Sequence, residues 1–183
     1  MKKFLLHITI FSSLLQSQDQ LFVGTRPLGM GGAFIAVADD GNTITWNPAG
    51  LPRLRRKEFT SSYADLFAMD ITHSYMGIVW PFGDRVAVGF DWANVGFDDQ
   101  ELNYNENKLN FSLGYQPFKL ISFGGTFKYL SRDMGLDGTS YGKSTGIGYD
   151  FGLLISPHKK IRFGLGLYAL GGTKVTYKQN KID

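Results

Sequence analysis

Long runs of period-two alternation are the feature of this sequence that most constrains its fold. In residues 108–116, four large apolar side chains alternate with polar or small ones. Residues 85–92, 146–155 and 161–167 show the same pattern, with glycine at many of the alternate positions. Because successive side chains of a strand point to opposite faces, each segment is predicted to form a strand with one apolar face.

We predict an all-β fold of about seven antiparallel strands. The strands are expected at 57–66, 69–80, 85–95, 107–116, 119–131, 144–156 and 161–171. Several exceed the five or six residues that are usual in globular proteins and match the ~9–11 residues of a tilted membrane-crossing strand. The pattern is therefore typical of an antiparallel transmembrane β-barrel, here an incomplete one.

The predicted connections alternate in length. Short turns at 81–84, 117–119 and 157–160 are separated by long polar loops at 94–106 and 132–143. Outer-membrane barrels have short periplasmic turns and longer external loops. Each short turn holds one proline, and we expect no proline inside a strand, where its missing N–H would interrupt the ladder.

Aromatic residues gather near the expected strand ends, as in the interfacial girdles of membrane barrels. The residues assigned to these girdles are Tyr75, Trp80, Phe82, Tyr115, Phe118 and Tyr129. The alternation also fits a soluble β-sandwich or a lipocalin-like barrel, and this alternative stays open. The girdles and an export signal favour the membrane barrel.

Residues 1–17 are predicted to be a secretory signal peptide with cleavage near Ser17. Two lysines precede an apolar stretch at 4–15 that is shorter than the ~20 residues of a membrane-spanning helix. A buried N-terminal helix or strand is the alternative. An exported chain built of such strands is expected in the bacterial outer membrane.

Composition excludes several kinds of chemistry. The chain has no cysteine, which excludes disulfides, thiolate zinc sites and cysteine nucleophiles. Its formal net charge of +3 is spread over the whole chain and gives no electrostatic case for binding nucleic acid. We predict no cofactor and no metal site.

The segment before the first strand, 18–56, is predicted to be a small N-terminal helical hatch. Small residues dominate it, and a short helix is expected over 31–38. Asn47 is predicted to cap a helical turn whose first residue is Pro48, because asparagine favours the N-cap and proline the first helical position.

The sequence GTRPLGMGGAFIAVADDGNTITWNPAGL at 24–51 resembles the N-terminal signature of the FadL/PorV-like superfamily of outer-membrane β-barrels. It is more similar to the PorV/PorQ-like group than to the fatty-acid transporters. The resemblance implies a hatch folded inside the barrel. The hatch-motif residues are Gly24, Arg26, Gly29, Gly31, Gly32, Asp39, Asp40, Trp46, Asn47, Pro48, Ala49 and Gly50.

The resemblance implies passive transport of hydrophobic compounds such as long-chain fatty acids, with the hatch controlling the opening. Two alternatives are a PorV/PorQ-like component of type IX protein secretion and a structural barrel without transport. The implied partners are outer-membrane lipid and either a hydrophobic small molecule or proteins of the secretion machinery.

Full members of the superfamily are considerably longer than this chain. Closed single-chain bacterial barrels have an even number of strands and at least eight. Residues 178–183 also lack the terminal aromatic residue of such barrels. We therefore expect 57–183 to be the N-terminal half of a barrel, with closure by an oligomer as the alternative.

Glycines recur on the face opposite the apolar one in the last two predicted strands. They leave room either for the hatch to pack or for an apolar passage. The candidates for facing the lumen are Gly148, Gly152, Leu154 and Tyr168.

Three motifs are tested and rejected. Residues 29–34 resemble a dinucleotide-binding loop but have Phe34 at the third glycine position. The G-x-S-x-G match at 138–142 lies between two predicted strands, which would place Ser140 and His158 at opposite ends of a strand. The acidic cluster Asp98, Asp99 and Glu101 fits a solvated loop better than a calcium site. We predict no enzyme activity.

Overall fold

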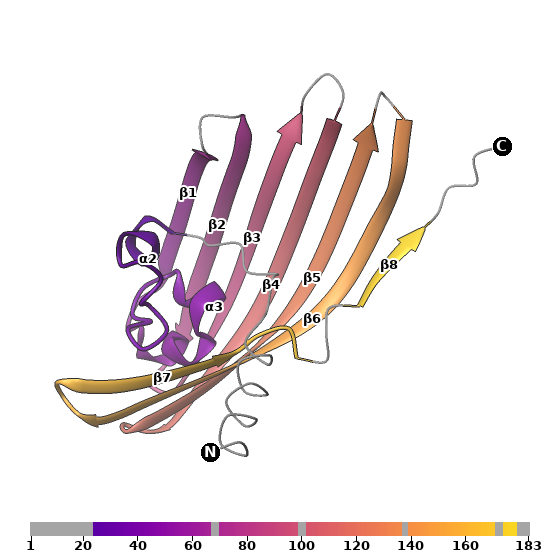
Figure 1. Cartoon of the computed structure of the whole chain (residues 1–183). Helices are drawn as coiled ribbons and strands as arrows, with labels where there is room; N and C mark the ends of the chain where they lie inside the picture. The colour runs from indigo at the N-terminus through magenta and orange to yellow at the C-terminus, as the bar shows by residue number, and fades with distance from the viewer. Residues whose placement is uncertain (1–23, 67–69, 99–101, 137–138, 171–173, 179–183) are drawn as a thin grey trace, which may run out of the picture.

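The computed structural model describes residues 24–66, 70–98, 102–136, 139–170 and 174–178. They form one curled antiparallel sheet in which β1 to β7 pair in sequence order (Figure 1). β7 pairs with the second half of β6, and β8 pairs with the first half. The strands are β1 (Glu58–Leu66), β2 (Ile71–Phe82), β3 (Val86–Asp98), β4 (Leu102–Phe118), β5 (Ile121–Leu136), β6 (Thr139–His158), β7 (Ile161–Leu167) and β8 (Lys174–Lys178).

The predicted all-β class is confirmed, and each of the seven expected strands has a counterpart. The predicted loops at 94–106 and 132–143 are wrong, because β3 continues to Asp98 and β4 already begins at Leu102. In the same way, β5 continues to Leu136 and β6 begins at Thr139. Backbone pairing of an antiparallel hairpin needs no apolar face, so these polar extensions remain in the ladder.

The three prolines assigned to turns lie inside strands, which corrects that prediction. Pro81, Pro117 and Pro157 stand near the ends of β2, β4 and β6. The strand register shifts at the positions of Pro117 and Pro157. An irregular position of this kind leaves a residue out of the ladder, so a proline there removes no hydrogen bond.

Large apolar side chains form rows across the outer face of the sheet. One row joins directly paired residues that are all at least 42 % exposed, namely Ile78, Phe90, Phe111, Phe127 and Tyr149. The adjacent rows consist of Met76, Trp92, Leu109, Tyr129 and Ile147 on one side and Trp80, Val88, Leu113, Gly125 and Phe151 on the other. We call these rows, with their continuation to the short turns, the apolar band.

The apolar band ends sharply toward the β3–β4 and β5–β6 hairpins. The next outward row is entirely polar and consists of Ser74, Asn94, Asn107, Ser131 and Thr145. On β4 the band extends from Leu109 to Phe118. At about 3.4 Å per residue this is roughly 30 Å along the strand, or about 23 Å along the axis of a barrel with the usual tilt of about 40°.

The inner face carries buried polar side chains, which are His73, Asp91, Glu106, Lys108, Asn110, Ser112, Ser122, Thr126, Lys128, Ser144 and Asp150. Tyr75 also faces inward and is 1 % exposed, so its assignment to an aromatic girdle is wrong. Its position is out of phase with the exposed Met76 and Ile78 of the same strand. The other five girdle candidates are 39–70 % exposed on the outer face.

The hatch, defined here as residues 24–54, contains helices α2 (Thr25–Gly29) and α3 (Thr43–Trp46) and the 3-10 helix η1 (Pro48–Arg53) (Figure 1). The helix expected over 31–38 is wrong, because residues 31–37 form turns. Gly31 and Gly32 have φ angles of +63° and +78°, which a right-handed helix does not accommodate.

No helix among the described residues is long and apolar enough to cross a membrane.

Glycines of the inner face allow the hatch backbone to contact the sheet. A Cβ atom at Gly124 would lie 2.2 Å from the carbonyl carbon of Pro48, and one at Gly152 would lie 2.1 Å from Asn47 Oδ1. A Cβ at Gly164 of β7 would lie 2.6 Å from the Cα of Ala36. Side chains at these positions would displace the hatch, so the glycines fix how closely it seats.

We predict that Gly124→Ala destabilises the chain by about 1–3 kcal/mol, because the added methyl group overlaps the hatch backbone. Gly125→Ala is the matched control, since a Cβ there faces outward and has its nearest neighbour, Asp150 O, at 3.8 Å. Urea unfolding of the chain in detergent micelles measures both. Equal unfolding free energies for the two variants would contradict this account of the hatch seat.

Candidate functional site

The candidate site is the contact between the hatch and the inner face of β2 to β7. Charged side chains hold the first part of the hatch together. Arg26 Nη1 lies 2.7 Å from both Asp39 Oδ1 and Asp40 Oδ2. The hydrogen bonds that Arg26 donates, first to Asp40 and then to Asp39, raise the pKa of Arg26, so its guanidinium stays charged.

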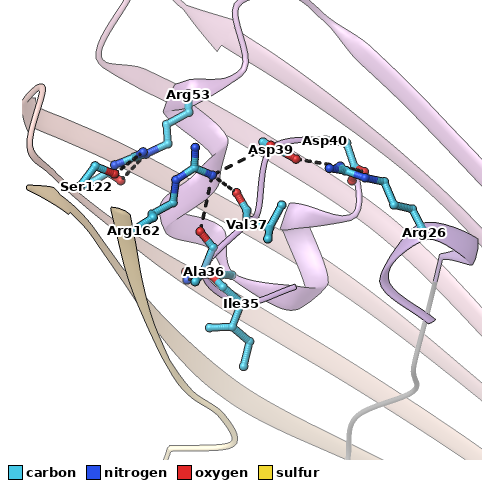
Figure 2. Close-up of polar contacts among 11 residues, drawn as sticks. Arg26, Ile35, Ala36, Val37, Asp39, Asp40, Arg53, Ser122 and Arg162 are labelled. Atoms are coloured by element: carbon cyan, nitrogen blue, oxygen red, sulfur yellow. Dashed lines mark hydrogen bonds and ion pairs between the residues drawn. The ribbon is translucent and has the colours of Figure 1, made fainter. Parts of the chain in front are cut away.

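A second arginine joins the hatch to the edge of the sheet (Figure 2). Arg162 of β7 donates hydrogen bonds to the backbone carbonyls of Ala36 and Val37. Its guanidinium also lies 4.0 Å from Asp39. Arg162 therefore tethers the turn at 36–39 to a strand that lies far from it in sequence.

Asn47 connects three parts of the molecule from a fully buried position. Its Oδ1 accepts a hydrogen bond from the N–H of Ala49 at 3.1 Å, which confirms the predicted cap of η1. Its Nδ2 donates to the carbonyl of Ile35 at 2.8 Å and to the carbonyl of Leu153 in β6 at 3.3 Å. The side chain thus joins two hatch segments and the sheet.

An apolar cluster forms where the hatch meets the inner face. Phe34 and Trp46 meet edge to face with their ring centroids 6.2 Å apart. Tyr75 and Leu154 from the sheet belong to the same buried cluster. The hydroxyl of Tyr168 donates a 2.5 Å hydrogen bond to the carbonyl of Trp46. A second buried apolar cluster, of Ile44, Leu51, Leu54, Val79 and Ala87, lies nearby between the hatch and the inner face.

The wall beside this cluster is polar, and several of its side chains pair with one another or with the hatch. Asp91 of β3 accepts hydrogen bonds from Thr45 Oγ1 of the hatch at 2.9 Å and from Asn110 Nδ2 at 2.8 Å. Further along the strands, Lys128 pairs with Asp150 at 2.7 Å. Pairing of this kind satisfies groups that would otherwise be costly to bury.

A further ion pair, between Arg132 of β5 and Glu106 of β4, lies nearer the β3–β4 and β5–β6 hairpins. Arg132 Nε is 2.6 Å from Glu106 Oε2.

Two clefts lie at opposite ends of the strands. One, of about 660 Å³, is lined mainly by residues in the outward phase of β2 to β5 near the β3–β4 hairpin, among them Thr72, Asn105 and Asp133. The other, of about 1060 Å³, lies at the opposite end, between the turn at 36–39 and the β4–β5 and β6–β7 turns.

The hatch-motif residues have distinct roles in the structure. Trp46, Asn47, Pro48, Ala49 and Gly50 are buried against the sheet or the rest of the hatch. Gly24, with φ of +89°, and Gly50 leave no room for a Cβ beside Asn42 and Ala38. Gly29 and Gly31 have open space around them, and Gly32 lies next to Trp46. The motif thus combines residues in contact with the sheet and residues that shape turns.

The four candidates for facing the lumen lie on the inner side of the sheet or at its edge. Gly148, Gly152 and Leu154 are buried, and Tyr168 is half-buried against the hatch. Gly152 seats the hatch rather than lining an open passage.

The structure does not bring the residues of the G-x-S-x-G match into a catalytic arrangement. Ser140 and His158 both belong to β6, eighteen positions apart, which is about 60 Å of extended strand. Asp98 ends β3, whereas Asp99, Glu101 and Gly138 lie outside the described residues, as does the predicted signal peptide at 1–17. In the described part of the chain, no group of three acidic or histidine residues could hold a metal ion.

Sequence reasoning did not single out Arg53, Asp91, Ser122 or Arg162. The alternation in β7 already places Arg162 on the inner side. Its hydrogen bond to Ala36, 126 positions away, has no local signal in the sequence.

No family model and no curated protein matches this chain.

We predict that Asn47→Ala destabilises the hatch by about 2–5 kcal/mol, because it removes the cap and leaves buried backbone groups without a partner. Hydrogen exchange of the amides in 35–49, read by mass spectrometry, should increase strongly. Asn103→Ala is the control, since Asn103 is exposed in β4. Unchanged exchange in 35–49 of the Asn47→Ala variant would rule out this role.

Proposed function

We propose that this chain forms a wall of a β-barrel in the bacterial outer membrane, with the hatch on the lumenal side. We further propose that the barrel passes hydrophobic compounds, such as long-chain fatty acids, and that hatch movement opens the path. The apolar band of the outer face is the observation that carries the proposal.

The height and sharp edge of the band support a lipid environment. Outer-membrane barrels carry an outward apolar band about 25 Å tall. The band here is of that height, and the polar row from Ser74 to Thr145 ends it on every strand from β2 to β6. The polar inner face is the arrangement expected of a barrel lumen and the reverse of a soluble core.

Closure of the barrel requires partners for the outer edges of β1 and β7. In the described part of the chain, β1 pairs with β2 alone and β7 with β6 alone. An unpaired edge in lipid costs several kcal/mol for each unsatisfied group. Further strands or a second copy of the chain would supply these partners.

The apolar cluster around Phe34 and Trp46 is the proposed contact region for a hydrophobic compound. It is one of two buried apolar clusters between the hatch and the sheet, and the other consists of Ile44, Leu51, Leu54, Val79 and Ala87. A compound that displaced the hatch from Leu154 and Tyr75 would bury its own apolar surface at about 25 cal/mol per Å². Hydrophobic burial would then supply most of the binding energy.

The alternative function is a component of protein secretion or a structural barrel without transport. The many contacts that hold the hatch against the sheet favour this alternative. Hydrogen bonds of Asn47, Thr45 and Arg162, together with the glycine contacts, hold the hatch at many points. A hatch held in this way could remain closed and serve as a fixed platform.

A reversible disulfide between the hatch and the sheet tests whether hatch movement is needed for transport. A Cβ at Gly89 would lie 2.7 Å from Ile44 Cγ1, so cysteines at both positions are close enough to form a disulfide between hatch and sheet. The chain has no other cysteine to interfere. In liposomes, the Ile44→Cys/Gly89→Cys variant should take up a long-chain fatty acid when reduced and stop when oxidised.

The single Ile44→Cys variant is the control, and its uptake should not respond to oxidation. Reduced protein that gives no uptake above empty liposomes would contradict the transport proposal. Co-purification of a secretion component from native membranes would then favour the alternative.

A further inference from the structure

The cleft of about 1060 Å³ beside the hatch concentrates positive charge. Its cationic side chains come from the hatch, from the β4–β5 and β6–β7 turns and from β7. They are Arg53, Lys119, Lys159, Lys160 and Arg162. Asp39 is the one carboxylate among the residues that line it. Since these five cations belong to four different elements, the fold itself brings them together.

Arg53, one of the residues that line this cleft, has a side-chain nitrogen without a hydrogen-bond partner. Its Nε donates to Ser122 Oγ at 3.2 Å (Figure 2). Its Nη1 donates to Ser156 Oγ at 2.8 Å. Its Nη2 is buried and has no hydrogen-bond partner. A buried guanidinium nitrogen without an acceptor is unfavourable, and the two serines hold the group so that Nη2 has a fixed direction.

The charge around Arg53 is not balanced by the protein. Burial, and after it the neighbouring charge of Arg162, lowers the pKa of Arg53. Asp39 is 2.7 Å from Arg26 but 4.0 Å from Arg162. The other partners of Arg162 are the neutral carbonyls of Ala36 and Val37. Two guanidinium groups therefore share this cleft, and the one carboxylate that lines it, Asp39, lies closer to Arg26 than to Arg162.

We propose that this cleft binds a phosphate group, with Arg53 and Arg162 as its main ligands. Phosphate offers several acceptor oxygens to donors that converge from different elements, and arginine suits it because its planar group donates two parallel hydrogen bonds. A single carboxylate would neutralise less of the charge that five cationic side chains bring.

The phosphate can belong to an anionic phospholipid headgroup or to a soluble phosphate compound. Leu120 and Ile161 also line the cleft and are 43 % and 50 % exposed, so apolar surface adjoins the cations. The soluble source requires no membrane, and this part of the inference is therefore independent of the proposed transport.

The first test titrates the full chain, in a non-ionic detergent, with inorganic phosphate in a calorimeter. Arg53→Gln should weaken binding at least tenfold, because it removes the charge and the unused donor. Lys159→Gln/Lys160→Gln should weaken it several-fold and reduce its dependence on salt. Arg56→Gln is the control, since Arg56 is 86 % exposed outside the cleft, and its affinity should equal that of the unmodified chain.

The second test uses native mass spectrometry to compare phosphatidylglycerol with phosphatidylcholine adducts of the same variants. Selective phosphatidylglycerol adducts that Arg53→Gln removes would identify the lipid source. Phosphate binding without such adducts would identify a soluble source. The inference is overturned if the unmodified chain binds neither probe, or if Arg53→Gln and Lys159→Gln/Lys160→Gln both bind like Arg56→Gln.

Discussion

The alternation of side chains across one antiparallel sheet is the constraint on which the rest of this structure depends. Each strand from β2 to β6 must suit two surroundings at once, since every second residue meets the hatch side and the others form the apolar band. Phe111, for example, is 54 % exposed, whereas its neighbour Ser112 is fully buried. A slip of one residue in register would exchange these two faces throughout a strand.

The inner face meets this constraint with glycine and paired polar groups instead of a conventional apolar core. Gly124 and Gly152 let the backbone of η1 approach the sheet more closely than any side chain would allow. Asn47 and Asp91 then join the hatch to the wall by hydrogen bonds. Specific polar contacts and close backbone approach hold the hatch, and the apolar cluster around Trp46 adds local burial.

The local parts of this architecture could be predicted from the sequence. Period-two alternation located the strands, and the Asn47–Pro48 pair predicted the start of η1, because both signals act over a few residues. The extent of β4 depends on pairing with neighbouring strands, which no local pattern encodes. The inward position of Tyr75 follows instead from its phase relative to Met76 and Ile78 in the same strand. The convergence of Arg53 and Arg162 depends on the curl of the whole sheet and could not be predicted.

Fluorescence quenching by lipids with brominated acyl chains tests the central claim, that the apolar band contacts lipid. Trp80 lies in the band and Trp46 is buried in the hatch. In reconstituted bilayers, the Trp46→Phe/Trp92→Phe variant, which retains Trp80, should be strongly quenched. The Trp80→Phe/Trp92→Phe variant, which retains Trp46, should not. An unquenched Trp80, with the folded chain remaining in the aqueous phase, would contradict the account.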